Sequence, residues 1–132
     1  MPLFTVTMRS GRTAREQDSI SVAIHDASVS VGYPEDDHFQ RFISLERADF
    51  RVSPRYPDLQ RPRTENVLMI EAVLSSGTAE NRKRSLLSAI VTRLQAAGID
   101  PNDVMVFFGE MDRASSSFGG GRPAPPVEVV PD

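Results

Sequence analysis

The sequence predicts an α/β (α+β) domain, a tandem β-α-β repeat that forms a four-stranded sheet with two helices on one face. One pattern occurs twice, in residues 2–46 and again in residues 66–110. Each time, a strand-like stretch is followed by a stretch with helical spacing and then by a second strand-like stretch. A strand, a helix and a strand in this order form a right-handed crossover with parallel pairing. Two such units in one domain predict a single sheet that carries both helices on the same side.

The first unit begins with residues 3–8, where alternating side chains are typical of a strand. Thr13 and Glu16 have the spacing of a capping box, which predicts that a helix starts there. Gly32 predicts the end of that helix, and residues 38–46 are expected to form the second strand. Between these signals, apolar residues follow the period of a helix at Ile20, Ala23, Ile24, Ala27 and Val31.

The second unit repeats this order. Residues 66–74 form a strongly apolar strand, and Thr78 in the turn that follows is a candidate helix cap. Gly98 and Pro101 predict where this helix stops, and residues 104–108 predict the fourth strand. The helix carries apolar residues at core spacing: Leu86, Leu87, Ile90, Val91, Leu94 and Ala97.

The remaining segments connect or extend this domain, which we place at residues 1–122. Residues 47–65 form a long polar connection, rich in arginine and proline. We interpret it first as a solvated loop and second as a lid or subunit-contact arm that brings arginines toward an anion. Residues 111–122 form a glycine-rich Phe-Gly loop. The proline-rich tail at 123–132 is expected to extend along a neighbouring subunit or to be disordered.

Composition excludes several classes of function. The 132 residues carry a net charge of −3, which argues against a nucleic-acid binder that works by bulk charge. The chain has no cysteine and only two histidines, so thiolate chemistry and a three-histidine metal site are excluded, and we expect no cofactor. No apolar run could span a membrane and no signal peptide pattern is present, so the expected location is the cytoplasm.

A four-stranded sheet with both helices on one side leaves its other face uncovered. Apolar side chains on such a face must be buried by another surface. The simplest candidate is another copy of the chain, so the sequence predicts a homo-oligomer.

Several short motifs coincide with this architecture. A proline stands at position 2, Gly11-Arg12 follows the first predicted strand, and residues 118–121 read Phe-Gly-x-Gly after the last one. Together with the doubled β-α-β unit, they resemble the tautomerase superfamily. The Gly-Arg turn and the Phe-Gly-x-Gly piece are similar to those of 4-oxalocrotonate tautomerase. The resemblance implies a tautomerase (MIF-like) fold, a catalytic amino-terminal Pro2 and a homotrimer. It also implies that Arg12 binds the carboxylate of an acid.

The doubled length and residues 34–40 are more similar to malonate semialdehyde decarboxylase. That family has a Pro-x-x-Asp-x-aromatic-Gln segment there, and its aspartate matches Asp37. The resemblance implies that Asp37 orients a water or receives a proton. Residues 75–78 depart from the pattern, because the decarboxylase family has two arginines at this turn and this chain has none. The substrate of that family is therefore not transferred to this protein.

The residues themselves suggest how Pro2 could act. Removal of Met1 would leave a secondary amine at Pro2, and its pKa must be lowered if it is to act as a base near neutral pH. Burial and nearby cations both lower the pKa of an amine. Phe118 is the candidate apolar wall, and Arg12 and Arg41 are the candidate cations.

Each candidate has a plainer alternative. Asp37 could be a turn former, Arg41 could make a sheet-face ion pair or a subunit contact, and Phe118 could belong to the core. His38, next to Asp37, is included among the substrate-binding candidates.

These observations favour an enzyme of the tautomerase type that moves a proton in a small 2-oxo or enol acid by means of Pro2. One alternative is a decarboxylase or hydratase of a small 3-oxo or unsaturated acid on the same site. Another is a non-catalytic homo-oligomer, which retention of Met1 would favour because Pro2 nitrogen would then be an amide. An RNA-binding ferredoxin-like domain ranks last, since the sequence lacks the aromatic pattern and the basic charge of such domains.

Overall fold

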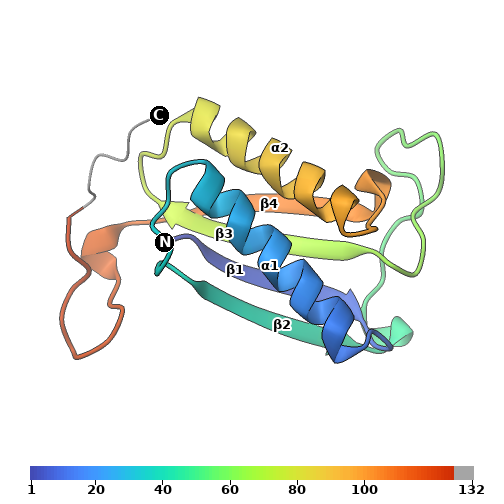
Figure 1. Ribbon diagram of the computed structural model, residues 1–132, viewed down its shortest axis with the longest axis horizontal. Helices are drawn as coiled ribbons and strands as arrows, with labels where there is room; N and C mark the ends of the chain where they lie inside the picture. Colours follow the sequence, from blue (N-terminus) through green and yellow to red (C-terminus); the bar gives the residue numbers. More distant parts are fainter. Residues whose placement is uncertain (127–132) are drawn as a thin grey trace.

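A computed structural model describes residues 1–126 of the chain, which form one four-stranded sheet covered by two long helices (Figure 1). Short 3₁₀ turns follow β2, α2 and β4. The main elements are β1 (Leu3–Arg9), α1 (Ala14–Ser30), β2 (Phe39–Leu45), β3 (Leu68–Ser75), α2 (Glu80–Ala96) and β4 (Val104–Met111).

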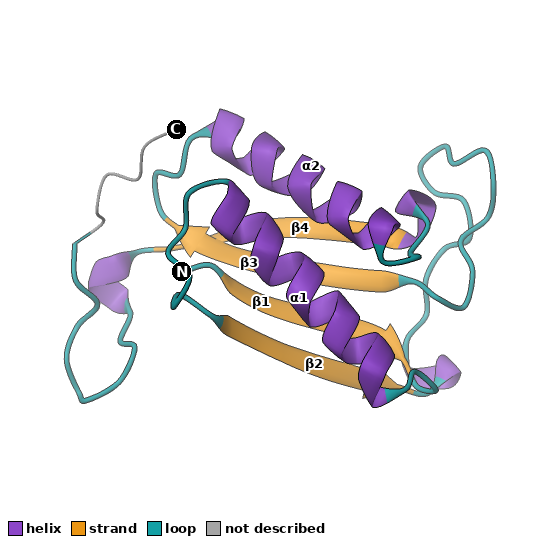
Figure 2. Ribbon diagram, viewed as in Figure 1, coloured by secondary structure: helices purple, strands orange, loops and turns teal. Residues whose placement is uncertain are grey.

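The strand order β2-β1-β3-β4 confirms the predicted tandem repeat. Strands β1 and β2 pair in parallel, and so do β3 and β4, as two β-α-β units require. The units meet where β1 pairs antiparallel with β3, and Leu3 lies opposite Val73. The amino-terminal ends of β1 and β2 therefore lie at the same end of the sheet as the carboxy-terminal ends of β3 and β4. Both helices lie on the same side of the sheet (Figure 2).

The core lies between the sheet and the helices. Alternate residues of β1 and β3 point toward the helices and are buried, as the period of a strand requires. The predicted helical stripes supply the other half of the core, including Ile24 from α1 and Ile90 from α2, neither of which is exposed. The buried set comprises Phe4, Val6, Met8, Ile20, Ala23, Ile24, Ala27, Leu68, Ile70, Ala72, Leu74, Leu86, Ile90 and Leu94.

The opposite face of the sheet carries large exposed apolar side chains. Among them are Phe39 and Ile43 of β2 and Phe107 and Met111 of β4. These residues alternate with inward-facing ones along each strand, so they share the face that no helix covers. The uncovered face therefore carries apolar side chains, as the sequence predicted. Among the described residues, neither helix combines the length and the hydropathy of a membrane span.

Two local predictions needed correction. Thr78 does not cap α2, because its hydroxyl donates to the carbonyl of Ser75 and the N-cap position is Ala79. The fourth strand extends to Met111 rather than ending at Phe108, because its register with β3 continues to the pair Ser75–Met111.

The connection at residues 47–65 lies at the sheet edge where β2 ends and β3 begins. The backbone N–H and the hydroxyl of Thr64 both donate to the buried carboxylate of Asp103, at 2.7 and 2.6 Å. The guanidinium of Arg61 is paired with Asp100 at 2.8 Å. Arg55 and Arg63 donate to carbonyls of the same connection. Whether this segment also acts as a lid or subunit-contact arm stays a prediction.

Candidate functional site

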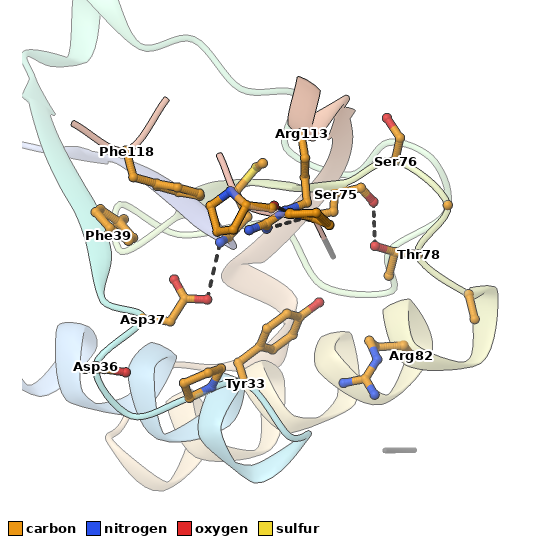
Figure 3. Close-up of a pocket in the computed structure, with 16 residues that line it drawn as sticks. Tyr33, Asp36, Asp37, Phe39, Ser75, Ser76, Thr78, Arg82, Arg113 and Phe118 are labelled. Carbon is orange, nitrogen blue, oxygen red and sulfur yellow. Dashed lines mark hydrogen bonds and ion pairs between the residues drawn. The ribbon is translucent and has the colours of Figure 1, made fainter. Parts of the chain in front are cut away.

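A pocket of about 660 Å³ lies at the end of the sheet that holds the amino terminus. The start of β1, the turn before β2, the end of β3 and the start of α2 meet there, together with the segment that follows β4 (Figure 3). Its lining consists of Met1, Tyr33, Pro34, Asp36, Asp37, Phe39, Ser75, Ser76, Gly77, Thr78, Ala79, Arg82, Arg113, Phe118, Pro125 and Pro126.

The amino-terminal nitrogen makes an ion pair in this pocket. Met1 nitrogen lies 3.3 Å from Oδ2 of Asp37, and the Asp37 side chain is only 16% exposed. The other carboxylate oxygen, Oδ1, is buried and accepts no hydrogen bond within the described part of the chain. The backbone N–H of Asp37 donates to Pro34, so a turn holds this residue at the pocket. Asp37 therefore has one oxygen on the amino terminus and a second that is available to another donor.

Two arginines approach the pocket from elements outside the amino-terminal unit. Arg82 belongs to the first turn of α2, and its guanidinium lies 5.5 Å from the ring centre of Tyr33 and donates to Val31. Arg113 follows β4, and its guanidinium lies 5.5 Å from the ring centre of Phe118. Both cations share the pocket with the Asp37 carboxylate (Figure 3). Their positive charge favours an anionic ligand.

The start of α2 adds to this positive potential. Ala79, at the N-cap position, lines the pocket, and no side chain of the described residues caps this end of the helix. The first N–H groups of a helix have no partner within the helix, and the helix dipole favours a negative charge beside them. An uncapped helix start next to two arginines is suited to a carboxylate.

The rest of the wall is aromatic. The rings of Phe39 and Phe118 lie 5.4 Å apart between centres. Burial raises the pKa of the Tyr33 phenol, while Arg82 opposes this effect and Asp37 adds to it. The phenol therefore stays protonated over a wider range of pH and can donate a hydrogen bond to a bound oxygen.

The pocket includes some predicted site residues and leaves others outside. Asp37 and Phe118 line it, and Pro2 is buried directly behind Met1. Arg12 lies at the other end of β1 and donates to the carbonyl of Asn66 at 2.6 Å. Burial lowers the pKa of Arg12, against the opposing effects of Glu16 and Asp103.

The predicted substrate-binding residues Arg41 and His38 also make contacts outside the pocket. Arg41 pairs with Thr5 on the uncovered face of the sheet, and its Nε donates to the Thr5 hydroxyl at 2.9 Å. The His38 ring stacks on His25 of α1 at 4.3 Å and does not line the pocket. Within a single chain, Arg12, Arg41 and His38 are not brought to the amino terminus, because strand direction and side-chain alternation place them elsewhere. Any role of these three in substrate binding stays a prediction.

Sequence reasoning missed Arg82, Arg113 and Tyr33. The decarboxylase pattern directed attention to the turn at residues 75–78, where no arginine occurs. Arg113 could have been found from topology, because it directly follows β4, which ends at the same sheet edge as the amino terminus. Arg82 and Tyr33 gave no comparable signal. Within residues 1–126, no three histidine, aspartate or glutamate side chains group together in a way that could hold a metal ion.

Comparison with known proteins identifies related sequences. A family profile described as "Tautomerase enzyme" matches residues 37–119. The chain is 30% identical over 124 residues to probable tautomerase YusQ of Bacillus subtilis (strain 168), and the match covers 92% of this chain and 96% of that protein.

Solved structures show the same fold. Two structures of malonate semialdehyde decarboxylase superpose with a TM-score of 0.84 at 27% identity. They cover 92% of this chain and 92% or 93% of their own, and one is described in terms of decarboxylase and hydratase activities. A symmetric trimer of fused 4-OT has a TM-score of 0.75 at 22% identity, with 93% of this chain and 96% of that chain covered.

Proposed function

The chain belongs to the tautomerase family, and we propose that it is an isomerase that uses the Pro2 amine to move a proton in a small 2-oxo or enol acid. In this proposal Met1 is removed, no cofactor takes part and the active form is a homotrimer. The observation that carries it is the amino-terminal nitrogen beside Asp37 in a pocket that also holds Arg82 and Arg113.

Removal of Met1 would move the amino terminus only a short way. Standard backbone geometry separates consecutive backbone nitrogens by about 3–3.6 Å. The Pro2 amine would therefore remain near Asp37 and would be exposed to the space that Met1 fills. Pro2 is itself buried, so its nitrogen would be held by the start of β1 rather than by a mobile end.

The geometry supports a division of roles. The substrate carboxylate would lie toward Arg113, Arg82 and the start of α2, with its apolar part against Phe39 and Phe118. The neutral amine would take the proton from the enol hydroxyl, and the proton would be returned at the neighbouring carbon, which leaves the keto acid. Asp37 would stabilise the positive charge that develops on the amine, and the Tyr33 hydroxyl could donate to the developing enolate oxygen.

The first experiment uses phenylenolpyruvate as a probe and follows its ketonisation by ultraviolet absorbance. Intact mass first establishes whether the purified protein begins at Pro2. The Pro2→Ala variant should then lose about 100-fold or more in kcat, the range that a proton-transfer group contributes. Pro54→Ala is the matched control, because Pro54 is exposed at the far end of the molecule. Ketonisation that is unaffected by Pro2→Ala would contradict the proposal, and retained Met1 with no activity would favour the non-catalytic alternative.

A specific observation favours a second candidate. The amino-terminal nitrogen makes an ion pair with Asp37 at 3.3 Å, a geometry in which the amine can serve as a proton donor. With Pro2 as the acid and Asp37 as the base or water-orienting group, the same site could decarboxylate a small 3-oxo acid or hydrate an unsaturated one. The pH dependence distinguishes the two, because kcat/KM rises with pH when the free amine is the base and falls with pH when the ammonium is the acid.

The proposed homotrimer would cover the apolar face of the sheet. Phe107 is 56% exposed and Met111 is 44% exposed on this face of the single chain. Sedimentation should therefore give about three times the monomer mass, and Phe107→Arg should shift the protein toward the monomer because a charge is costly in a buried interface. A wild-type monomer at micromolar concentration would contradict this part of the proposal.

A further inference from the structure

The segment that follows Phe118 turns back over the pocket. Gly119, Gly120 and Gly121 have φ values of +132°, +69° and +69°, a region that side chains disfavour. Gly119 forms a β-bridge with Arg122 across this turn. Three consecutive glycines therefore reverse the chain direction, and the residues that follow them return to the pocket that holds the amino terminus.

Residues 124–126, which we call the return segment, are seated on the chain at a defined point. The N–H of Ala124 donates to the carbonyl of Ser116 at 2.7 Å. Ala124 is only 9% exposed, although both of its neighbours are exposed. A buried alanine between two exposed prolines indicates a specific contact, since a segment in free solution would expose all three residues.

The return segment also holds one of the two arginines of the pocket. The carbonyl oxygen of Pro125 accepts a hydrogen bond from Nε of Arg113, and Ser75 Oγ lies 3.3 Å from Nη1 of the same guanidinium. A guanidinium has five N–H donors. Nε donates to Pro125, so each Nη atom still has an N–H for a carboxylate. These two N–H groups lie in one plane, as a bidentate contact with a carboxylate requires.

Proline suits this position for a second reason. Pro125 and Pro126 both line the pocket, and neither carries a backbone N–H. They can supply a carbonyl to Arg113 without offering a competing donor to a bound acid.

We infer that the return segment is a positioning element of the carboxylate site, in which the Pro125 carbonyl orients Arg113 toward the carboxylate of the bound acid. The inference rests on the proposed function in one respect, that the ligand is a small carboxylic acid. It concerns the binding of that acid and not the proton transfer. The positioning residues are Ala124 and Pro125, which act through Arg113.

Calorimetric titration with pyruvate and phenylpyruvate tests this inference without turnover. Ala124→Leu places a larger neutral side chain at this buried position, which should lift the segment and release Arg113. We expect both acids to bind about tenfold more weakly, the effect of losing one well-oriented charged hydrogen bond. Gly120→Ala provides a second route to the same displacement, because φ of +69° is strained for alanine. Ala48→Leu is the matched control, since Ala48 is exposed at the other end of the sheet.

A double-mutant cycle separates positioning from general stabilisation. Arg113→Lys keeps the positive charge but loses the planar fork. If the segment acts through Arg113, Ala124→Leu should weaken binding in the wild-type background and have no further effect in the Arg113→Lys background. Thermal melting of each variant checks that the fold is retained.

Additive effects of the two changes, or unchanged binding in Ala124→Leu and Gly120→Ala, would overturn the inference. Failure of the wild-type protein to bind either acid would overturn it as well. The proposed proton transfer fails separately, if ketonisation does not depend on Pro2 while carboxylate binding still depends on Ala124 and Arg113.

Discussion

The two long helices have the same length but begin in different ways. In α1, the Thr13 hydroxyl accepts the N–H of Glu16 and the Glu16 carboxylate accepts the N–H of Thr13, both at 3.1 Å. In α2, the N-cap is Ala79, which has no side-chain acceptor, and the preceding Thr78 donates its hydroxyl to Ser75 instead. Each helix has 17 residues, so length does not explain the difference.

Position in the fold accounts for the contrast. The start of α1 lies at the sheet edge remote from the pocket, because it follows the end of β1. The start of α2 follows the end of β3 and lines the pocket. The remote helix start has a side-chain cap, whereas the start at the pocket has none among the described residues. A helix start without a side-chain cap is less stable than a capped one, so α2 gives up some stability at the pocket.

Among changes at the two helix starts, the largest effect is expected when a cap is supplied to α2. Ala79→Asp would offer a carboxylate acceptor to N–H groups of the first turn and place a negative charge beside the proposed carboxylate site. We expect KM for phenylenolpyruvate to rise about tenfold or more, while the free energy of unfolding rises by about 1 kcal/mol. Steady-state kinetics and urea denaturation measure the two quantities.

Ala79→Ser is the control for Ala79→Asp, since it supplies a cap without a charge and should raise KM less. An unchanged KM in Ala79→Asp, together with higher stability, would show that the start of α2 is not used for binding.

A smaller effect is expected when the cap of α1 is removed. Thr13→Ala should lower the free energy of unfolding by about 1 kcal/mol, because the N–H of Glu16 loses its acceptor. KM should not change, since Thr13 lies at the other edge of the sheet. Urea denaturation gives the stability, with Thr92→Ala on the exposed surface of α2 as the matched control. A change in KM as large as that of Ala79→Asp would contradict the assignment of separate roles to the two helix starts.

The smallest effect is expected on the stability of the fold at low pH. Hydrogen bonds from the backbone and side chain of Thr13 lower the pKa of Glu16. A carboxylate with a lowered pKa in the folded state stabilises the fold above its unfolded pKa, about 4.3, and loses this contribution as pH falls through the folded pKa. Wild type should therefore lose slightly more stability than Glu16→Gln between about pH 6 and about pH 3. Equal losses in the two proteins would contradict a role of the Glu16 charge in capping.

The local signals in the sequence predicted most of the fold. Thr13 and Glu16 marked the start of α1, and Gly32 and Gly98 lie just past the ends of the two helices, as predicted. Both glycines have positive φ. The failed prediction of a cap for α2 was also local. Thr78 is a residue type that often caps helices, but its hydroxyl donates to the Ser75 carbonyl instead. Pro2, Asp37 and Phe118 were singled out by a resemblance between motifs, and their proposed catalytic roles stay predictions.

Local patterns in the sequence specify the repeat, the helix ends and the apolar face of each element, since these depend on residues only a few positions apart. Which side chains share a pocket depends instead on how the two units pack. Arg12 is near Pro2 in sequence but lies at the opposite end of β1, whereas Arg82 and Arg113 are remote in sequence but line the pocket at the amino terminus. The physical reason is the antiparallel register of β1 and β3, which brings the end of the second unit to the start of the first. No pattern within either unit specifies that register, because it depends on how the two units pack together.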